Sequence, residues 1–326
     1  MTRILVTGGA GYIGSHCCKA LAAAGIEPVV YDDFSTGHSE FVRWGPLVEG
    51  DIRDGRALRA ALAEHRPDAV MHFAALALVG ESVADPGLYW EVNVGGTLTL
   101  LKAMRDEGVN RMVFSSTCAV YGEPKTVPIG EGEALEPVNP YGASKLACER
   151  MMDDFDAAHG LRSVRLRYFN AAGADPDAEI GEWHDPETHL LPLVIETALG
   201  RRAAIDVFGA DYDTPDGTAI RDYVHVVDLA AAHLAALRYL LEGGATAAVN
   251  LGTGQGASVE DVVAAVEAVS GRPIARRLGP RRAGDPPRLV AAPGVARDLL
   301  GWRAERSDLG TIVADALRWH RTRNAS

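Results

Sequence analysis

A run of glycines directly after the first apolar segment constrains this chain more than any other feature. Residues 4–7 (ILVT) have the pattern of a short buried strand, and the sequence GGAGYIG that follows places Gly8, Gly11 and Gly14 three residues apart. A strand that enters a helix through glycines lets the backbone approach a pyrophosphate, which then binds at the amides of the helix N-terminus. The spacing is GxxGxxG rather than GxGxxG. It predicts the first unit of a dinucleotide-binding sheet if the rest of the chain repeats the pattern.

The alternation of strand and helix continues through the first half of the chain. Short apolar runs are separated by longer segments whose apolar residues have helical spacing. Buried strands joined by helices form parallel sheets, so we predict an α/β fold with a Rossmann-type, doubly wound parallel sheet. The predicted strands are 4–7, 28–32, 69–73, 111–115 and 163–168, and the predicted helices are 12–24, 55–65, 89–107 and 141–158.

The second half of the chain is richer in loops. Segments such as GADPDAEIGEWHDPET and LGPRRAGDPP contain many Gly, Pro and Asp residues. We therefore divide the chain into a dinucleotide-binding domain, 1–170, and a smaller α/β substrate domain, 171–326, over the C-terminal edge of the sheet. Residues 220–240 are expected to return to the first domain. The predicted helices of the second half are near 190–200, 228–242, 258–270 and 308–322.

Composition and charge narrow the function classes. The 326 residues carry a net charge of −12, which argues against nucleic acid or an anionic membrane surface as a partner. No stretch approaches the ~18–20 apolar residues of a membrane span, and the chain enters its first strand without a signal-like segment. The four cysteines show no paired spacing and are expected to be reduced. We expect a cytoplasmic protein.

An acidic residue stands where a dinucleotide-binding site needs one. Asp32 ends the second predicted strand, 18 residues after Gly14. An acid at this place hydrogen-bonds the ribose diol of the adenosine and repels a 2′-phosphate, so NAD is favoured over NADP as the cofactor. The next strand pattern is followed by GDIRD, whose Asp51 and Ile52 are predicted to hold the adenine amine and ring face.

A second group of polar residues follows the fourth predicted strand. Ser115, Ser116 and Thr117 stand at its C-terminal end, the edge where open α/β sheets bind their ligands. The segment NPYGASK then carries the signals of a helix start, because Asn139 suits the N-cap and Pro140 suits the first helical position.

Tyr141 and Lys145 lie one turn apart on the same side of this predicted helix. Tyrosine has a pKa near 10, so only about one phenol in a thousand is ionised at pH 7. A cation about 4 Å away, at an effective dielectric constant near 20, contributes roughly 4 kcal/mol, or about three pKa units. We therefore predict that Lys145 lowers the pKa of Tyr141 and makes it a general base, with Thr117 relaying the proton of the substrate hydroxyl.

Longer strings connect these elements to a known family. TGGAGYIG, HFAA, SST…VYG and YGASK resemble the extended short-chain dehydrogenases/reductases. Within that family, GDIRD, HFAALALVGES, RYFNAAGADP, GTAIRDYVHVVDLA and RRAGDPPRLVA resemble the UDP-glucose 4-epimerase (UDP-galactose 4-epimerase) group, from residue 3 to about 320. The resemblance implies an isomerase of galactose metabolism that interconverts UDP-glucose and UDP-galactose through a transient 4-keto sugar and a tightly bound NAD.

The resemblance also implies roles for individual residues. Thr117, Tyr141 and Lys145 correspond to the catalytic triad. A homodimer is implied, in which helices 89–107 and 141–158 form the contact. The residues implied to line the NAD site are Gly8, Gly11, Tyr12, Ile13, Gly14, Asp32, Asp51, Ile52, Phe73, Asn93, Tyr141, Lys145 and Tyr168. Those implied to bind the UDP-sugar are Thr117, Tyr141, Asn170, Leu190, Phe208, Arg221, Arg282 and Asp285.

Several arginines gather in one short segment of this acidic chain. A diphosphate needs cations, and guanidinium groups match phosphate oxygens better than ammonium groups do. We expect this cluster to meet the diphosphate of the substrate. Its members are Arg276, Arg277, Arg281, Arg282 and Arg288.

Alternative functions remain open at this point. Leu289 stands where the resemblance implies a gate on pocket size, so UDP-N-acetylhexosamines are candidate substrates, as are UDP-xylose and UDP-arabinose. Some epimerases carry a lysine where this chain has Ala77, so no cation is expected there. A nucleotide-sugar dehydratase would need an Asp-Glu pair after the strand-end hydroxyl, where this chain has Cys118 and Ala119. An NAD-binding regulator would not need the Thr/Tyr/Lys set.

No metal site is predicted. His184 and His189 have Asp185 and Glu187 between them, but this loop lacks ligand periodicity, and its side chains are expected to face water. His72 is expected to be a hydrogen-bonded residue at a strand end.

Overall fold

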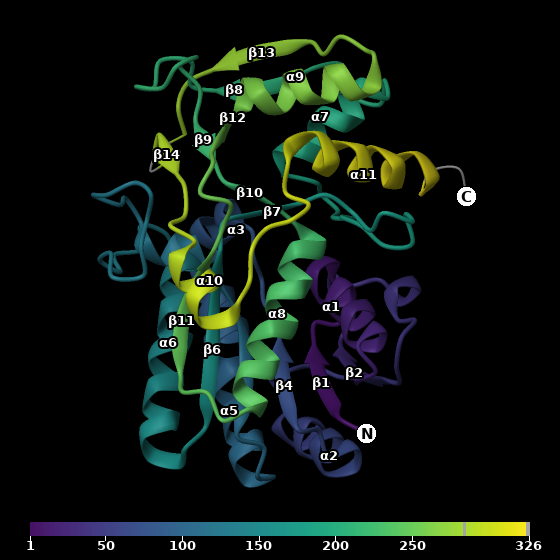
Figure 1. Cartoon of the computed structure of the whole chain (residues 1–326), viewed down its shortest axis with the longest axis vertical. Coiled ribbons are helices and arrows are strands. Elements are labelled where there is room, and N and C mark those ends of the chain that lie inside the picture. Colours follow the sequence, from purple (N-terminus) through teal and green to yellow (C-terminus); the bar gives the residue numbers. More distant parts are fainter. Residues whose placement is uncertain (283–284, 324–326) are drawn as a thin grey trace.

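A parallel sheet forms the centre of the molecule. The computed structural model describes residues 1–282 and 285–323. Within these residues, seven parallel strands are hydrogen-bonded in the order β11-β6-β5-β4-β1-β2-β3 (Figure 1). The predicted α/β class and doubly wound sheet are confirmed. The strands are β1 (Arg3–Thr7), β2 (Glu27–Asp32), β3 (Leu47–Glu49), β4 (Ala69–His72), β5 (Arg111–Thr117), β6 (Arg162–Tyr168) and β11 (Ala247–Leu251).

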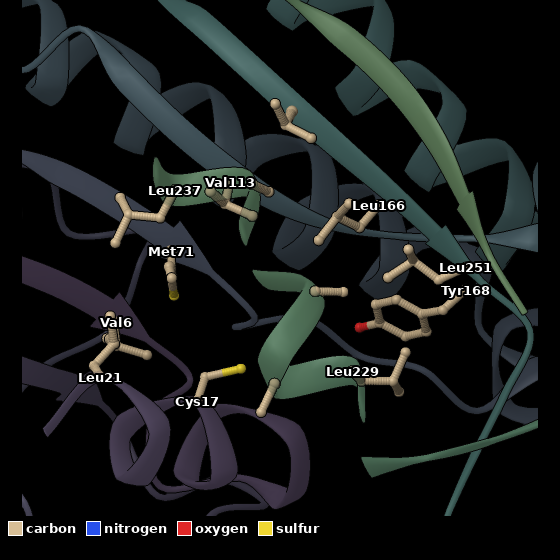
Figure 2. Close-up of a cluster of buried hydrophobic side chains, with 14 of the residues drawn as sticks. Val6, Cys17, Leu21, Met71, Val113, Leu166, Tyr168, Leu229, Leu237 and Leu251 are labelled. Atoms are coloured by element: carbon tan, nitrogen blue, oxygen red, sulfur yellow. The ribbon is translucent and has the colours of Figure 1, made fainter. Parts of the chain in front are cut away.

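Helices cover both faces of this sheet. On one face, strand residues such as Val6 and Met71 pack against Cys17 and Leu21 of α1 and Leu237 of α8 (Figure 2). On the other face, α2, α5 and α6 bury their apolar sides against the same strands. Strands that are buried on both faces explain why their sequences are continuously apolar. The helices are α1 (Tyr12–Ala23), α8 (Val226–Leu241) and α10 (Gly294–Leu300) on the first face, and α2 (Gly55–His65), α5 (Gly96–Asp106) and α6 (Pro140–His159) on the second.

The strand order creates a crevice at the carboxyl edge of the sheet. β1 lies between β2 and β4, so the chain crosses over to one side of β1 for β2 and β3 and to the other side for β4, β5 and β6. Loops that leave neighbouring strands in opposite directions open a ligand-binding crevice between them. The glycine turn after β1 lies at this crevice.

A smaller group of elements lies over the carboxyl edge, at the top of Figure 1. β8 pairs with β13, and α7, α9 and α11 build a separate apolar core beside them. Three elements of the same half of the chain instead pack with the central sheet: β11 is one of its strands, and α8 and α10 cover one of its faces. The elements of the smaller group are β7 (Asn170–Ala172), α7 (Leu190–Ala198), β8 (Ile205–Phe208), β9 (Ile220–Arg221), β10 (Tyr223–His225), β12 (Ala257–Ser258), α9 (Val259–Ser270), β13 (Arg276–Gly279), β14 (Arg288–Leu289) and α11 (Leu309–Thr322).

The structure divides one predicted helix. The segment 89–107 is α4 (Pro86–Tyr89), a π-helical stretch Trp90–Gly95, and then α5. The wider π turn carries Asn93, whose buried side chain reaches across to Leu76, which helical periodicity alone does not reveal. The short helices α3 (Val79–Ala84), Ser39–Phe41 and Cys118–Tyr121 complete the first half. In the described part of the chain, no helix combines the length and apolar character needed to cross a bilayer.

Candidate active site

The glycine turn is closed tightly by its neighbours. Gly8 has φ +73°, and a Cβ there would lie 2.5 Å from the backbone nitrogen of Ala74. A Cβ on Gly14 would lie 2.1 Å from the carbonyl oxygen of Gly8. Gly11 is the N-cap of α1, and its N–H donates to the Gly8 carbonyl at 3.1 Å. Because side chains are excluded, the amides at the start of α1 stay open to a pyrophosphate, so the turn fits a dinucleotide.

Asp32 lies beside this turn. Its carboxylate accepts hydrogen bonds from the backbone N–H groups of Ala10 and Phe34, both at 2.9 Å. Burial raises the pKa of Asp32, while these two amides lower it. The carboxylate is thus fixed next to the glycine turn, as a contact with an adenosine ribose requires.

The two residues predicted to contact the adenine, Asp51 and Ile52, differ in burial and in partners. Asp51 is half-buried, and its carboxylate pairs with Arg53 at 2.6 Å. Ile52 is buried and packs against α5, since a Cβ on Gly96 would lie 2.5 Å from its Cδ1. Ile52 therefore has a fixed apolar position, whereas Asp51 already has a partner that a ligand would have to share.

Two of the residues implied for the NAD site use their side chains to form hydrogen bonds with other parts of the protein. Asn93 is buried, and its amide exchanges hydrogen bonds with the backbone of Leu76, at 2.8 and 3.0 Å, and donates to Ser144 at 3.1 Å. The Tyr12 hydroxyl donates to the Gly173 carbonyl at 2.6 Å. Both residues therefore hold the loops around the crevice in place.

The remaining implied NAD residues lie at the crevice or beneath it. Ile13 of α1 and Phe73, just after β4, pack against the apolar core. The Phe73 N–H donates to the Thr7 carbonyl at 2.8 Å, which continues the sheet pairing past the end of β4. Tyr168 ends β6, and its hydroxyl shares a hydrogen bond with Ser115.

The start of α6 is packed directly onto the end of β5. The Asn139 side chain caps the helix by accepting from the Gly142 N–H at 2.9 Å, as the sequence predicts. A Cβ on Gly142 would lie 2.5 Å from the Ala119 carbonyl, so only glycine permits this approach. The contact brings Tyr141 close to Thr117, whose hydroxyl acts to lower the pKa of the phenol.

Lys145 is buried one turn further along α6. Its Nζ donates to the Ser115 carbonyl at 3.0 Å and lies 4.9 Å from the centre of the Phe114 ring. Burial lowers the pKa of Lys145 to about 8, although the nearby Cys148 and Glu149 act in the opposite direction. A lysine with such a pKa can exchange its proton close to neutral pH.

The predicted effect of Lys145 on Tyr141 is not what this structure shows for the protein alone. Burial raises the pKa of Tyr141 to about 12, and the nearby Thr117 hydroxyl offsets this rise only in part. Among the described residues, the groups that shift this pKa do not include Lys145. The physical reason is that the ammonium is held at the Ser115 carbonyl, in a site where burial penalises every charge.

Sequence reasoning missed a buried network directly beneath the triad. Glu149 lies one turn after Lys145 and pairs with Arg167 of β6 at 2.5 Å, with both side chains at most 5% exposed. Glu149 also accepts from the Ser116 hydroxyl at 2.5 Å, and Arg167 donates to the Tyr121 hydroxyl at 2.9 Å. The four-residue spacing of Lys145 and Glu149 was a signal, but the partner on β6 comes from the fold.

Four of the residues implied for the UDP-sugar lie together near the smaller group of elements, where the Asp285 N–H donates to the Arg282 carbonyl at 3.4 Å. Arg282 lies 4.1 Å over the Phe208 ring, and Arg221 pairs with Asp285. Arg221 also acts on the pKa of Cys118, which follows Thr117 directly, so this group borders the triad.

Two other implied substrate residues lie at the starts of elements in the smaller group. Asn170 begins β7, where its N–H donates to the Asp222 carbonyl at 2.9 Å, and Leu190 begins α7. Leu289 packs in a small apolar cluster with Cys118 and Phe169. The possible gate residue therefore lies next to the end of β5.

The arginine-rich segment does not act as one cluster, which corrects the sequence expectation. Arg276 faces α9 and pairs with Glu260 at 2.8 Å and Glu267 at 3.1 Å. Arg281 pairs with Asp211 at 2.7 Å. Arg282 lies over the Phe208 ring, and Arg288 donates to the Asp213 carbonyl at 3.2 Å. Alternation along β13 and the acidic residues of neighbouring elements separate side chains that are adjacent in sequence.

Together, a glycine turn with an acid at the end of β2 and a Thr/Tyr/Lys set at the same crevice define a Rossmann-type enzyme that uses a nicotinamide cofactor. Comparison with known proteins agrees. Residues 4–252 match the NAD dependent epimerase/dehydratase family, and the chain belongs to that family. It is 56% identical to the UDP-glucose 4-epimerase of Rhizobium leguminosarum bv. trifolii, over 98% of both chains.

Solved structures extend this likeness to three dimensions. The UDP-glucose 4-epimerase from Brucella ovis, in complex with NAD, is 53% identical, with a TM-score of 0.96 over 98% of each chain. The UDP-glucose 4-epimerase from Bifidobacterium longum, in complex with NAD⁺ and UDP, is 38% identical, with a TM-score of 0.94 over 99% of each chain. The prediction of the family from sequence strings is confirmed.

Proposed function

We propose that this chain interconverts UDP-glucose and UDP-galactose by inverting C4 of the hexose through a transient 4-keto sugar. The observation that carries the proposal is the contact of Tyr141 with Thr117, one turn from Lys145, at the crevice that the glycine turn borders. Relatives named UDP-glucose 4-epimerase at 55% and 56% identity over nearly the whole chain support the same activity.

The residues present fit NAD as the cofactor. Gly8, Gly11 and Gly14 leave the amides of α1 open for the pyrophosphate, and Asp32 lies where it meets the adenosine ribose. The Asp32 carboxylate disfavours a 2′-phosphate by charge repulsion. When bound, NAD supplies the acceptor for the hydride of the sugar C4 and returns that hydride after the sugar has turned.

Tyr141 and Thr117 have separate roles in the proposed proton transfer. Tyr141 takes the proton of the sugar 4-hydroxyl, and Thr117 shares a hydrogen bond with the reacting groups. With a pKa of about 12 in the protein alone, Tyr141 is mostly protonated at pH 7, so activity requires that the loaded site stabilise the phenolate. Of the Tyr141 and Lys145 side chains, Lys145 has the pKa nearer to neutral pH, at about 8, and so exchanges its proton more readily there.

The smaller domain is proposed to grip the nucleotide and to leave the sugar loose. Phe208 and Arg282 offer a stacked aromatic and guanidinium surface for the uridine and diphosphate, and Arg221 adds a second cation. Binding energy that is spent far from C4 holds the substrate while the hexose rotates. On this view, residues 1–170 bind the cofactor and residues 171–326 bind the UDP-sugar, apart from α8, β11 and α10, which pack with the central sheet.

A second candidate substrate follows from Leu289. Its side chain is of intermediate size and packs beside Cys118 at the end of β5. A UDP-Glc/GlcNAc 4-epimerase from Campylobacter jejuni is 39% identical, with a TM-score of 0.87 over 99% of this chain, so the fold accommodates both sugars in that enzyme. We infer that some UDP-N-acetylhexosamine is turned over, more slowly than UDP-glucose. No contact in the site favours UDP-xylose or UDP-arabinose within the described residues, and they serve as comparison substrates.

A dehydratase is not supported by the site. Cys118 stands where an acid would be needed, and burial raises the pKa of its thiol to about 12, so it is a poor proton donor.

One experiment tests the proposed function. The purified protein is denatured, the released nucleotide is identified, and UDP-galactose, UDP-N-acetylgalactosamine and UDP-arabinose are assayed side by side. Released NAD with fastest turnover of UDP-galactose is expected. Turnover of UDP-arabinose alone, or of none of the three, would overturn the proposal.

We also infer a cytoplasmic homodimer. Trp90 is 45% exposed, and α5 and α6 lie side by side with their outer faces away from the sheet, which offers a helix pair to a second copy. The described cysteines are free, in keeping with a reducing compartment. Light scattering tests the dimer and cell fractionation tests the location; a monomer, or recovery outside the cytoplasm, would contradict the respective inference.

A further inference from the structure

Four potential metal ligands converge in the loop between β7 and α7. They are two carboxylates and two imidazoles, and one ligand atom from each lies within 4.8 Å of all the others. The Nδ1 atom of His184 lies 3.5 Å from Glu182 Oε1 and 3.6 Å from Glu187 Oε2. The Nδ1 atom of His189 lies 2.6 Å from Glu182 Oε1 and 3.6 Å from Glu187 Oε1. The four side chains therefore form a closed ring in which acids and histidines alternate.

The size of this ring matches the first coordination shell of a small divalent cation. Zn²⁺ binds histidine nitrogen and carboxylate oxygen at about 2.0–2.2 Å, so the ligand atoms of a tetrahedral site lie about 3.3–3.6 Å apart. Three of the four nitrogen–oxygen distances in the ring, at 3.5 and 3.6 Å, agree with this value. The fourth pair, His189 and Glu182 at 2.6 Å, forms a hydrogen bond and has to separate by about 1 Å around an ion.

A second observation points to a ligand at the same place. The His184 Nδ1 atom is buried and forms no well-aligned hydrogen bond among the described residues, although the two carboxylates lie near it at 3.5 and 3.6 Å. A buried nitrogen without a partner is costly, and coordination by a cation removes that cost. In the ion-free protein burial lowers the pKa of His184, but Glu182 and Glu187 raise it to about 10, so an ion has to displace the proton. Two carboxylates and two neutral imidazoles then balance the charge of a divalent ion.

The surroundings fix the ligands in this arrangement. The Glu187 carboxylate accepts from the backbone N–H groups of Thr188 at 2.8 Å and His189 at 2.9 Å. The backbone carbonyl of Glu182 accepts from the indole N–H of Trp319 on α11 at 2.9 Å, and the Glu182 side chain is 4% exposed. Such hydrogen bonds around the ligands are typical of metal sites that are built into a fold.

A neighbouring acidic cluster shows the contrast. Asp175, Asp177 and Glu179 also bring their carboxylates within 4.8 Å of one another. There, however, the Lys19 ammonium already lies among them, 2.7 Å from Asp175 and 3.9 Å from Asp177, and in contact with Glu179. The positive charge that this cluster needs is part of the protein, so it has no place for an ion and serves as an internal control.

We propose that Glu182, His184, Glu187 and His189 form a binding site for a divalent transition-metal ion of the Zn²⁺ type. Mixed imidazole and carboxylate ligands favour Zn²⁺ and its neighbours over Mg²⁺ or Ca²⁺, which prefer oxygen ligands alone. The ion would tie the loop at 182–189 to the first turn of α7, which begins at Leu190. This site revises the sequence expectation that these side chains merely face water, and it is independent of the proposed epimerase activity.

Metal content and ligand geometry provide the test. The purified full-length protein is stripped with EDTA and titrated with Zn²⁺, and bound zinc is measured by plasma mass spectrometry after gel filtration. Co²⁺ is titrated in parallel, because a four-coordinate site gives visible absorption much stronger than that of hydrated Co²⁺. The variants are His184→Gln and Glu182→Gln, with Asp177→Asn as the matched control in the acidic cluster.

We expect one tightly bound Zn²⁺ per chain and a Co²⁺ spectrum of the four-coordinate type. When free Zn²⁺ is present at 100 times its dissociation constant, binding should stabilise the folded protein by about 2.7 kcal/mol and raise its Tm by about 4 °C. His184→Gln and Glu182→Gln should weaken binding at least about 100-fold, while Asp177→Asn leaves it unchanged. Should a variant fail to fold, the stoichiometry and Co²⁺ spectrum of the unaltered protein still decide.

Three results would overturn the site. One is less than about 0.1 equivalent of bound Zn²⁺ in the unaltered protein. Another is a Co²⁺ spectrum like that of the hydrated ion. The third is equal zinc binding by the unaltered protein and a folded His184→Gln variant, because zinc would then bind at other histidines. In each case the four side chains are an ion-pair network without a metal.

Discussion

The two sides of the crevice are built in opposite ways. On the sheet side, Lys145 is 3% exposed and Thr117 is 7% exposed, and the buried Glu149–Arg167 pair lies beneath them. On the opposite side, Arg282 is exposed and Arg221 pairs with an Asp285 side chain that is 30% exposed. Chemistry at one carbon needs fixed groups, whereas a substrate that must turn needs a grip that adjusts. Four predictions test this contrast, from the largest expected effect to the smallest.

Activity should be almost completely lost when the phenol oxygen of Tyr141, on the sheet side of the crevice, is removed. Tyr141→Phe deletes the phenol oxygen without changing the packing of the ring. We expect kcat to fall by about 10²–10⁴-fold, the range for loss of a general acid–base group. Released NAD and the affinity for UDP should stay unchanged. If kcat falls less than about tenfold, Tyr141 is not the base.

The buried Glu149–Arg167 ion pair should contribute far more to stability than the partly exposed Arg221–Asp285 pair. Glu149→Gln leaves the Arg167 charge buried without its partner, which costs about 3–5 kcal/mol of unfolding free energy. The corresponding change at the substrate side, Asp285→Asn, should cost less than about 1 kcal/mol, because that pair is partly open to solvent. Urea denaturation of both variants measures the difference. Equal losses would contradict the contrast.

The substrate side should show its effect in KM. Arg282→Ala removes a guanidinium from the Phe208 ring, and loss of a charge-assisted contact of about 1.5–3 kcal/mol raises KM by about 10- to 100-fold. Because the contact acts equally on substrate and transition state, kcat should change little. Arg277→Ala, in the same segment, is the control and should stay within about twofold. A loss confined to kcat would place Arg282 in the chemistry instead.

The pH dependence of stability should report the burial of Lys145. Its pKa is about 8 in the folded protein and near 10.5 in the unfolded chain, so between these values only the unfolded chain keeps the proton. Proton binding therefore favours the unfolded state, and this effect fades as pH rises. The unfolding free energy accordingly rises as pH goes from 8 to 10. The rise should be roughly 2 kcal/mol larger than in Lys145→Met. Parallel pH profiles for the two proteins would refute the lowered pKa.

Much of the fold and of the catalytic set could be predicted because it rests on local patterns. The glycine turn, the strand runs and the Asn139–Pro140 helix start each lie within a few residues, and the structure places them as expected. The pKa of Tyr141 could not be predicted in this way. Spacing showed that Lys145 is near, but not that its ammonium points to the Ser115 carbonyl.

The sequence by itself determined the β–turn–α repeat, the acid after the second strand and the position of the Tyr141–Lys145 pair on one helix, because these depend on periodicity and backbone sterics within one element. Only the tertiary structure decided which distant charges meet. It paired Glu149 with Arg167 and spread the arginine segment over several acidic partners. It also decided that four side chains of one loop, Glu182, His184, Glu187 and His189, close into a ring. Contacts of this kind depend on how the elements pack in space, and local sequence patterns do not show which side chains the packing brings together.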